Sequence, residues 1–245
     1  MPDFPSWLWF SITRLGGVGV TVPLALTIAA WLAVGYTWQI TRRWLLALGV
    51  AITIIMGTKI AFLGWGIGIL ALDFTGVSGH ATLSAAVYPV AFSLMLARTG
   101  KTLRLVGAVA GLAMGIIISY SRIALAAHSP AEAIAGSTLG TLTALFFLTG
   151  WWKTQPHHRM LAAPIILSMV AIVFVLHNIS IPTYRWMTRI ALIASSHEHP
   201  FVRAKWHHMD AMRHASEEHA SASSPSSASS ASAASAASAV PSPAH

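Results

Sequence analysis

The sequence contains no cysteine and few charged residues. Without a thiol, the chain can form no disulfide, no thiolate nucleophile and no cysteine-ligated zinc site. Charged residues make up 9% of the chain, with only seven Asp and Glu, whereas 55% of the residues are hydrophobic. Apolar runs near the length needed to cross a bilayer recur along it. We therefore expect an integral membrane protein with no soluble domain of useful size.

The formal net charge of +8 raises the question of an anionic partner. The basic residues lie in short loops and near the C-terminus, and they form no basic module interleaved with aromatic residues, as nucleic-acid binding would favour. Membrane lipids with anionic headgroups are the better match. We expect no nucleic-acid partner.

Six apolar segments predict an all-α fold, a polytopic bundle of about six transmembrane helices. They cover residues 18–38, 44–63, 81–97, 103–120, 130–150 and 161–177. Small residues at four-residue spacing favour close helix packing over ligand binding. These are Gly107, Gly111 and Gly115 in the fourth segment and Gly136 and Gly140 in the fifth.

The remaining parts of the chain divide by composition. Residues 1–17 form an aromatic-rich interfacial segment without the basic start or cleavage site of a signal peptide, and residues 18–177 form the transmembrane domain. Residues 178–214 form a basic, histidine-rich tail, and the Ser/Ala-rich residues 215–245 are expected to be disordered. The tail histidines could bind a metal, but a solvated tail is the preferred interpretation. They are His197, His199, His207, His208 and His214.

The loop charges predict the orientation of the bundle. Three alternate loops carry basic residues and are therefore expected on the cytoplasmic side. These residues are Arg42, Arg43, Arg98, Lys101, Arg104, Lys153 and Arg159. The two opposite loops, residues 64–79 and 121–129, then lie at the outer face. Six spans also place the basic tail outside, against the same rule, so a five-span bundle remains an alternative.

The segment from Ser121 to Glu132 carries the first group of ionisable side chains. Ser129 suits a helix N-cap, with Glu132 three residues later, and together they predict a capping box. Capping alone is one interpretation of Glu132. In the other, the carboxylate also holds one ring nitrogen of His128 and leaves the second free to attack. The adjoining helix N-terminus favours an anionic ligand.

A second histidine lies in the turn Thr75 to His80, which leads into the third span. Ser78 can cap that helix, and Gly79 allows a ligand to approach the backbone closely. His80 alone would be read as a hydrogen-bonded core histidine. Ionisable groups at membrane depth are rare, so the presence of His128 in the facing loop favours a shared functional site.

Two cations complete the candidate set. Lys59 lies within an apolar stretch, where it either snorkels to the interface or binds phosphate. Arg122 offers a planar fork suited to phosphate oxygens, or it anchors a helix end at the interface.

These motifs resemble those of the type-2 phosphatidic acid phosphatase superfamily over roughly residues 55–150. The family's third motif is Ser-Arg, five residues, His, three residues, Asp, and the chain matches it with Ser121, Arg122, His128 and Glu132, the last in place of Asp.

The family's second motif, Pro-Ser-Gly-His, corresponds to Val77-Ser78-Gly79-His80. The first motif, Lys followed by six residues and Arg-Pro, survives only as Lys59, because Gly66 and Ile67 take the later positions.

The resemblance implies a role for each side chain. His128 would attack phosphorus, His80 would protonate the leaving oxygen, and Glu132 would orient His128. The phosphate would be bound by Lys59, Ser78, Gly79, Ser121 and Arg122. No metal or other cofactor is implied.

We therefore expect a membrane phosphatase that hydrolyses a lipid phosphate or diphosphate monoester through a phosphohistidine. Its site would face the periplasm or exterior of a bacterial plasma membrane. The alternatives are a lipid phosphotransferase and a non-catalytic lipid-binding or transport protein.

Overall fold

The computed structural model describes residues 5–154, 161–179, 181–208, 212 and 215–217. It divides into two compact units, residues 1–202 and 203–245. In the second unit, residues 203–208 are helical, and most of the segment expected to be disordered lies outside the described residues. The first unit carries every motif discussed above.

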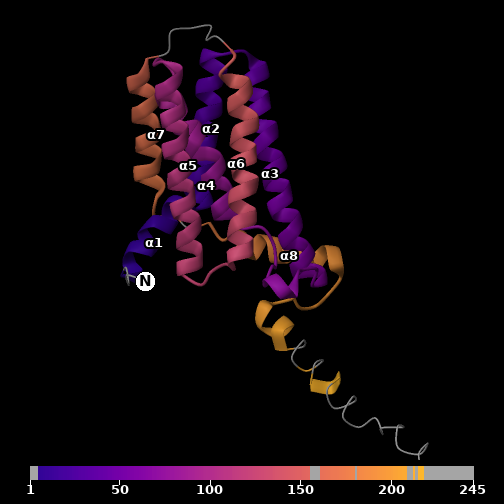
Figure 1. The fold of residues 1–245 in the computed structure, drawn as a ribbon. Coiled ribbons are helices and arrows are strands. Elements are labelled where there is room, and N and C mark those ends of the chain that lie inside the picture. The colour runs from indigo at the N-terminus through magenta and orange to yellow at the C-terminus, as the bar shows by residue number, and fades with distance from the viewer. Residues whose placement is uncertain (1–4, 155–160, 180, 209–211, 213–214, 218–245) are drawn as a thin grey trace, which may run out of the picture. The chain divides into compact units, whose positions relative to one another are not determined.

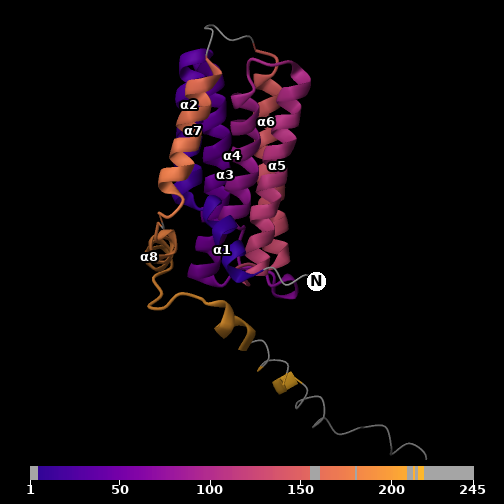
Figure 2. The same ribbon diagram turned by 90° about the vertical axis from the view of Figure 1, so that its left-hand side faces the viewer.

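Six α-helices run side by side in the first unit (Figures 1 and 2). They are α2 (Val18–Gly35), α3 (Trp38–Trp65), α4 (Gly79–Met95), α5 (Lys101–Ala124), α6 (Pro130–Trp151) and α7 (Ala162–Leu176). Each coincides with one of the six predicted segments. The largest shift is at the start of α3, where the helix begins before the apolar run and includes Arg42 and Arg43.

Four stretches are long and apolar enough to cross a membrane: Ser6–Gly35, Trp38–Trp65, Lys101–Ala124 and Pro130–Trp151. Helix α7 is a shorter apolar helix. Helix α4 has 17 residues, so it is shorter than these four stretches, and it is less apolar than α7. It buries polar side chains such as Thr82, Ser84 and Ser93 among its neighbours, so its surface is matched to protein and not to lipid.

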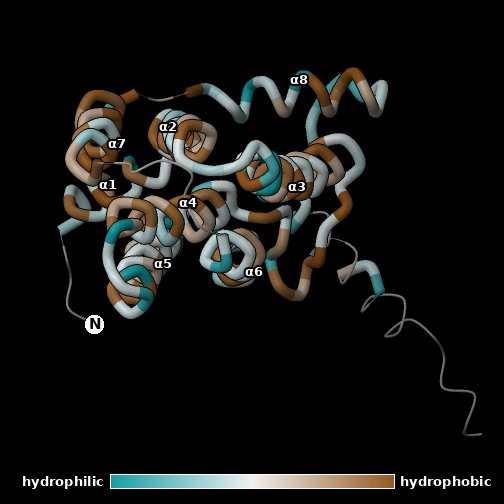
Figure 3. Tube along the Cα trace, turned by 90° about the horizontal axis from the view of Figure 1, so that it is seen from above, coloured by the Kyte–Doolittle hydropathy of each residue, from teal (hydrophilic) through white to brown (hydrophobic). Residues whose placement is uncertain are grey.

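Helix α4 lies at the centre of the bundle (Figure 3) and contacts α2, α3, α5, α6 and α7. Glycines let its two main neighbours approach closely. A Cβ atom on Gly115 of α5 would lie 2.9 Å from the Ala85 Cα, and one on Gly136 of α6 would lie 2.7 Å from the Ser78 carbonyl oxygen. The prediction that these glycines pack helices is confirmed.

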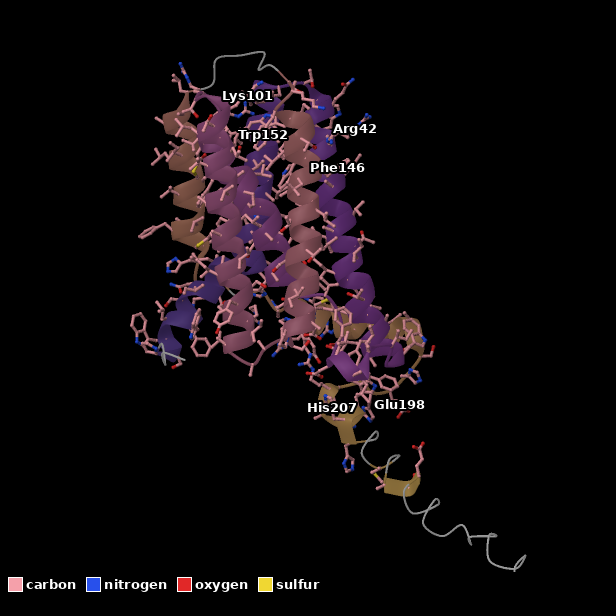
Figure 4. The ribbon with its side chains drawn as sticks, in the orientation of Figure 1. Arg42, Lys101, Phe146, Trp152, Glu198 and His207 are labelled. Atoms are coloured by element: carbon pink, nitrogen blue, oxygen red, sulfur yellow. The ribbon has the colours of Figure 1, made fainter. Side chains whose placement is uncertain are left out.

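The basic loops gather at one end of the bundle, as predicted. Figure 4 shows Arg42 and Lys101 near the start of α3 and α5, together with Trp152 after α6. Glu198 lies at the opposite end. Because α3 and α5 both run away from the basic end, the loops that carry the histidine motifs lie with Glu198. Arg159 falls outside the described residues.

Two further helices flank this opposite end. Helix α1 (Ser6–Leu15) packs on α5, with the Trp9 and Tyr120 rings 5.4 Å apart. The Tyr88 hydroxyl of α4 donates a hydrogen bond of 2.7 Å to the Leu15 carbonyl. Most of the segment predicted to be interfacial is thus a helix fixed to the bundle core.

Helix α8 (Thr183–Ser195) differs from the solvated tail expected there, because it packs against the end of α3. The His197 ring bonds the Gly64 carbonyl through Nδ1 at 2.8 Å, and the Phe201 N–H donates to the Leu63 carbonyl at 2.9 Å. The search for apolar runs did not find this helix, because its basic residues lower the mean hydropathy of the segment. Within the residues that the structure describes, no three His, Asp or Glu side chains gather as a metal site.

Candidate active site

The loop between α5 and α6 places His128 at the entrance to α6. The backbone N–H groups of Ala127 and His128 both donate to the Arg122 carbonyl, at 3.0 and 3.2 Å, so the chain turns tightly at the end of α5. Ser129 then caps α6. Its hydroxyl accepts from the Glu132 N–H, and the Glu132 carboxylate accepts from the Ser129 N–H, both at 3.3 Å. The predicted capping box is confirmed.

Glu132 also holds the His128 ring, with its Oε2 atom 2.6 Å from Nδ1. An ionised carboxylate can only accept, so Nδ1 carries the proton and Nε2 keeps its lone pair. The other carboxylate oxygen, Oε1, accepts from the Thr75 N–H at 2.7 Å and from the Thr75 hydroxyl at 2.5 Å. Glu132 is fully buried. It therefore caps α6, orients His128 and ties the 66–78 loop to both.

The environment of His128 favours its neutral form. Burial lowers the pKa of His128, the hydrogen bond to Glu132 raises it, and the positive charges of Lys59 and Arg122 lower it again, leaving the pKa below the ordinary value. The side chain is 12% exposed. A neutral ring with a free Nε2 is the form that a nucleophile requires.

The second histidine motif is joined directly to the first. Ser78 occupies the N-cap position of α4, and its N–H donates to the Glu132 carbonyl at 3.2 Å. His80 lies one position into the helix, where the charges of Arg122, His128 and Lys59 act on it. Its ring makes no hydrogen bond within the described part of the chain, so the interpretation as a hydrogen-bonded core histidine finds no support.

The corner between α1 and α2 covers one side of His80. A Cβ atom on Gly16 would lie 3.5 Å from the His80 Cδ2 atom, and one on Gly17 would lie 3.9 Å from Nε2. Thr13, three residues before Gly16, accepts a hydrogen bond of 2.9 Å from Nη1 of Arg122. The N-terminal helix therefore belongs to the wall of the site.

Three polar groups near the histidines are buried without a hydrogen-bond partner among the described residues: the Ser78 hydroxyl, Nε of Arg122, and the Ser84 hydroxyl one turn after His80. The expectation that the Ser78 side chain caps α4 is wrong, since its hydroxyl makes no bond to the helix. Beside it, Gly79 leaves the backbone open, because a Cβ there would meet only Ile55, at 3.6 Å. Ser121 differs, because its hydroxyl donates to the Ile118 carbonyl of its own helix at 2.6 Å.

Lys59 lies beside the site and beneath the 66–78 loop. Gly76 has a φ of +141°, which side-chain-bearing residues rarely adopt, and a Cβ there would lie 3.1 Å from the Lys59 Cγ. The ammonium acts electrostatically on both His80 and His128. Lys59 therefore lies near both histidines, as the phosphate-binding alternative requires.

The structure explains the incomplete first motif. Gly66, at the position of the family's arginine, ends α3 in the left-handed conformation with φ +69°. A Cβ atom there would lie 2.8 Å from the Phe201 ring. An arginine side chain at this position would clash with Phe201, in the segment that follows α8. Of the cations in the family's motifs, the chain therefore has Lys59 and Arg122 but not the arginine of the first motif.

Three threonines form hydrogen bonds that support the site, and the sequence analysis did not predict these contacts. Thr75 bonds Glu132, Thr13 bonds Arg122, and the Thr58 hydroxyl accepts from the Val77 N–H at 3.1 Å. Thr75 adjoins the second motif, which could have drawn attention to it. Thr13 lies 109 residues from its partner, and nothing in its local sequence indicates the contact.

Comparison with known proteins identifies the family. The PAP2 superfamily matches residues 71–156, the stretch that contains both histidine motifs. An uncharacterized 22.5 kDa protein in the cps region of Klebsiella pneumoniae is 32% identical over 203 residues, covering 81% of this chain and 97% of the relative. The chain belongs to the PAP2 superfamily. Membership in the PAP2 superfamily implies a phosphatase-like activity. No solved structure matches.

Proposed function

We propose that this PAP2 protein is a membrane phosphatase that hydrolyses a lipid phosphate or diphosphate monoester through a phosphohistidine. The arrangement of His128 supports this proposal above all. Its Nδ1 is held by the buried carboxylate of Glu132, which leaves Nε2 as the only ring nitrogen available to a substrate. This is the arrangement of a nucleophile oriented through its second nitrogen.

In the proposed reaction, Nε2 of His128 forms a bond to phosphorus while the bond from phosphorus to the lipid oxygen breaks. His80 gives a proton to that departing oxygen. His80 then takes a proton from water as the water oxygen attacks the phosphohistidine, and inorganic phosphate leaves with His128 restored. A group that protonates the leaving oxygen is left ready to act as base, so one histidine can serve both half-reactions.

The charge of the transferring phosphoryl group would be met by donors already in place. Lys59 and Arg122 supply positive charge, and the Ser78 hydroxyl and Arg122 Nε are buried polar groups without a protein partner among the described residues. Buried polar groups normally have partners, so these two are suited to a ligand. Donors fixed before reaction stabilise developing charge most effectively. The chain's own residues thus fill every role, and the proposal contains no metal.

The proposed enzyme crosses the membrane with all six helices of the bundle, α4 enclosed by the others. The basic end faces the cytoplasm by the positive-inside rule, and the histidines face the periplasm or exterior. The headgroup of a lipid in the outer leaflet would reach the site while its acyl chains stay in the bilayer.

A non-catalytic lipid-binding protein is the second candidate. The replacement of the family's arginine by Gly66, closed over by Phe201, favours it, because the site has one cation fewer than the family pattern. The two functions differ in turnover, since a binding protein would release no phosphate.

The test is release of inorganic phosphate by purified protein from phosphatidate, phosphatidylglycerol phosphate and a polyprenyl diphosphate, with chelator present throughout. We expect release from at least one of them, and none from a His128→Ala variant. An acid-labile phosphoenzyme should form in the native chain and be lost in this variant. No release from any substrate by folded protein would reject the proposal, and turnover that stops with chelator would reject its metal-free mechanism.

A further inference from the structure

Helix α8 presents three separate sectors around its axis. Its buried edge is marked by Ala191, which packs against the end of α3. At about 100° per residue, Arg185 and Arg189 lie about 120° and 160° from Ala191. Trp186, Ile190 and Ile193 lie about 200° to 260° away. The helix thus has a protein-facing edge, a basic strip and an apolar strip.

The two outer sectors are exposed. Ile193 is 82% exposed, and Trp186 and Ile190 are exposed as well. Arg185 and Arg189 make no hydrogen bond or ion pair with the described part of the chain. An apolar strip next to a basic strip is the pattern of a helix that lies in a membrane interface, with its apolar residues among acyl chains and its cations among headgroups.

The position of α8 along the bundle agrees with that pattern. Helix α3 carries Arg42 and Arg43 at one end, and α8 packs on it at Gly64. A hydrocarbon core about 30 Å thick takes about 20 helical residues, so a core that begins just after Arg43 ends near Gly64. Figures 1 and 3 show α8 running across the bundle axis, and Figure 2 shows it end-on. The helix therefore lies at the level of the headgroups and parallel to the membrane plane.

We propose that α8 is an in-plane helix that binds anionic phospholipids of the outer leaflet. Trp186, Ile190 and Ile193 enter the acyl layer, and Arg185 and Arg189 contact headgroup phosphates. Charge complementarity selects lipid over a second copy of the chain, because a symmetric dimer would bring the basic strips of two α8 helices near each other. This proposal does not depend on the phosphatase activity.

The natural absence of cysteine allows a direct test. A single-cysteine Ile193→Cys protein carrying a fluorophore is reconstituted in phosphatidylcholine vesicles. Brominated lipid with either a phosphatidylcholine or a phosphatidylglycerol headgroup is then included as quencher. We expect strong quenching by both, with phosphatidylglycerol preferred. The fluorophore on an Arg185→Cys protein should be quenched less by either lipid.

The preference for the anionic lipid should depend on the arginines. Each basic residue near an anionic surface contributes about fivefold in affinity, so Arg185→Gln together with Arg189→Gln should reduce the preference by up to about 30-fold. The double Lys variant should keep it, and Arg42→Gln at the opposite end should not change it. A fluorophore on the Ile193→Cys protein that neither lipid quenches would overturn the proposal. So would equal quenching by both lipids, or energy transfer between fluorophores of two copies in place of lipid quenching.

Discussion

Replacing Glu132 by Gln separates its role as a helix cap from its role as the partner of His128. Both carboxylate oxygens accept a backbone N–H, Oε1 from Thr75 at 2.7 Å and Oε2 from Ser129 at 3.3 Å. A glutamine amide has one oxygen and one NH₂ group, so one of these positions must receive a donor. The NH₂ group should take the Oε2 position, where the opposing N–H is more distant.

That exchange changes the His128 ring. Nδ1 now faces a donor and must offer its lone pair, so the ring proton moves to Nε2, the atom proposed to attack phosphorus. In a Ser-His-Asp triad, the same change from carboxylate to amide fixes the wrong tautomer and lowers kcat about 10⁴-fold. We expect a loss of that order. One unsatisfied buried donor should also cost about 1–3 kcal/mol in free energy of unfolding.

The assay measures phosphate release at saturating lipid, phosphoenzyme formation after rapid mixing, and thermal unfolding. Glu132→Asp, the residue of the family motif, should retain far more activity than Glu132→Gln. Glu198→Gln, at an exposed carboxylate, serves as the control and should behave like the native chain. If folded Glu132→Gln protein forms phosphoenzyme at the native rate, Glu132 is only a cap.

The remaining predictions concern the side chains around His128. Thr13→Val should raise KM and weaken inhibition by inorganic phosphate about tenfold or more, because a hydrogen bond to a charged group contributes about 1.5–3 kcal/mol. Thr13→Ser should restore both constants. Unchanged constants in Thr13→Val would refute a role for Thr13 in positioning Arg122. His80→Ala should accumulate phosphoenzyme with a nitrophenyl phosphate, whose leaving group needs no proton, and rapid turnover of that intermediate would contradict its role as base. Because the pKa of His128 is lowered in the folded protein, the neutral ring should persist at pH values below 6.5, the usual histidine pKa. The folding stability that the neutral ring contributes should be present above about pH 6.5 and should be lost as the pH falls through the lower folded pKa. An acid limb of kcat/KM above pH 6.5 would argue against this.

The sequence predicted the helices of the bundle well because lipid imposes a simple rule. A backbone that crosses hydrocarbon must be helical and largely apolar, so apolar runs predicted all six helices of the bundle, although α4 and α7 are shorter than a typical span of about 20 residues. The motif residues His80, His128 and Glu132 could be placed at one end of the bundle, because successive loops lie at alternate ends and both motif loops fall on the same side. The capping box followed from local spacing, since Ser129 and Glu132 are neighbours on a helix's first turn.

The contacts that sequence could not predict are those between distant segments. The bond from Arg122 to Thr13 joins α5 to α1, and nothing near either residue selects the other. Helix α8 was missed for a different reason. Its arginines cancel its apolar residues in an average over the chain, although Arg185 and Arg189 at four-residue spacing, beside Trp186 and Ile190, form a helical pattern.

The absence of the first-motif arginine is linked to the packing of the segment that follows α8, because the Phe201 ring occupies the space that a side chain at Gly66 would need. Gly66 adopts the left-handed conformation that stops α3, and the same absence of a side chain admits the Phe201 ring. That ring belongs to the segment that follows α8, whose backbone is fixed to the Leu63 carbonyl. At the position of the family's arginine, a glycine therefore allows the segment that follows α8 to attach to the end of α3. In the proposed mechanism, the positive charge at the site then comes from Lys59, beneath Gly76, and from Arg122, which donates to Thr13 of α1. The 66–78 loop and helix α1 would thus both support the proposed chemistry.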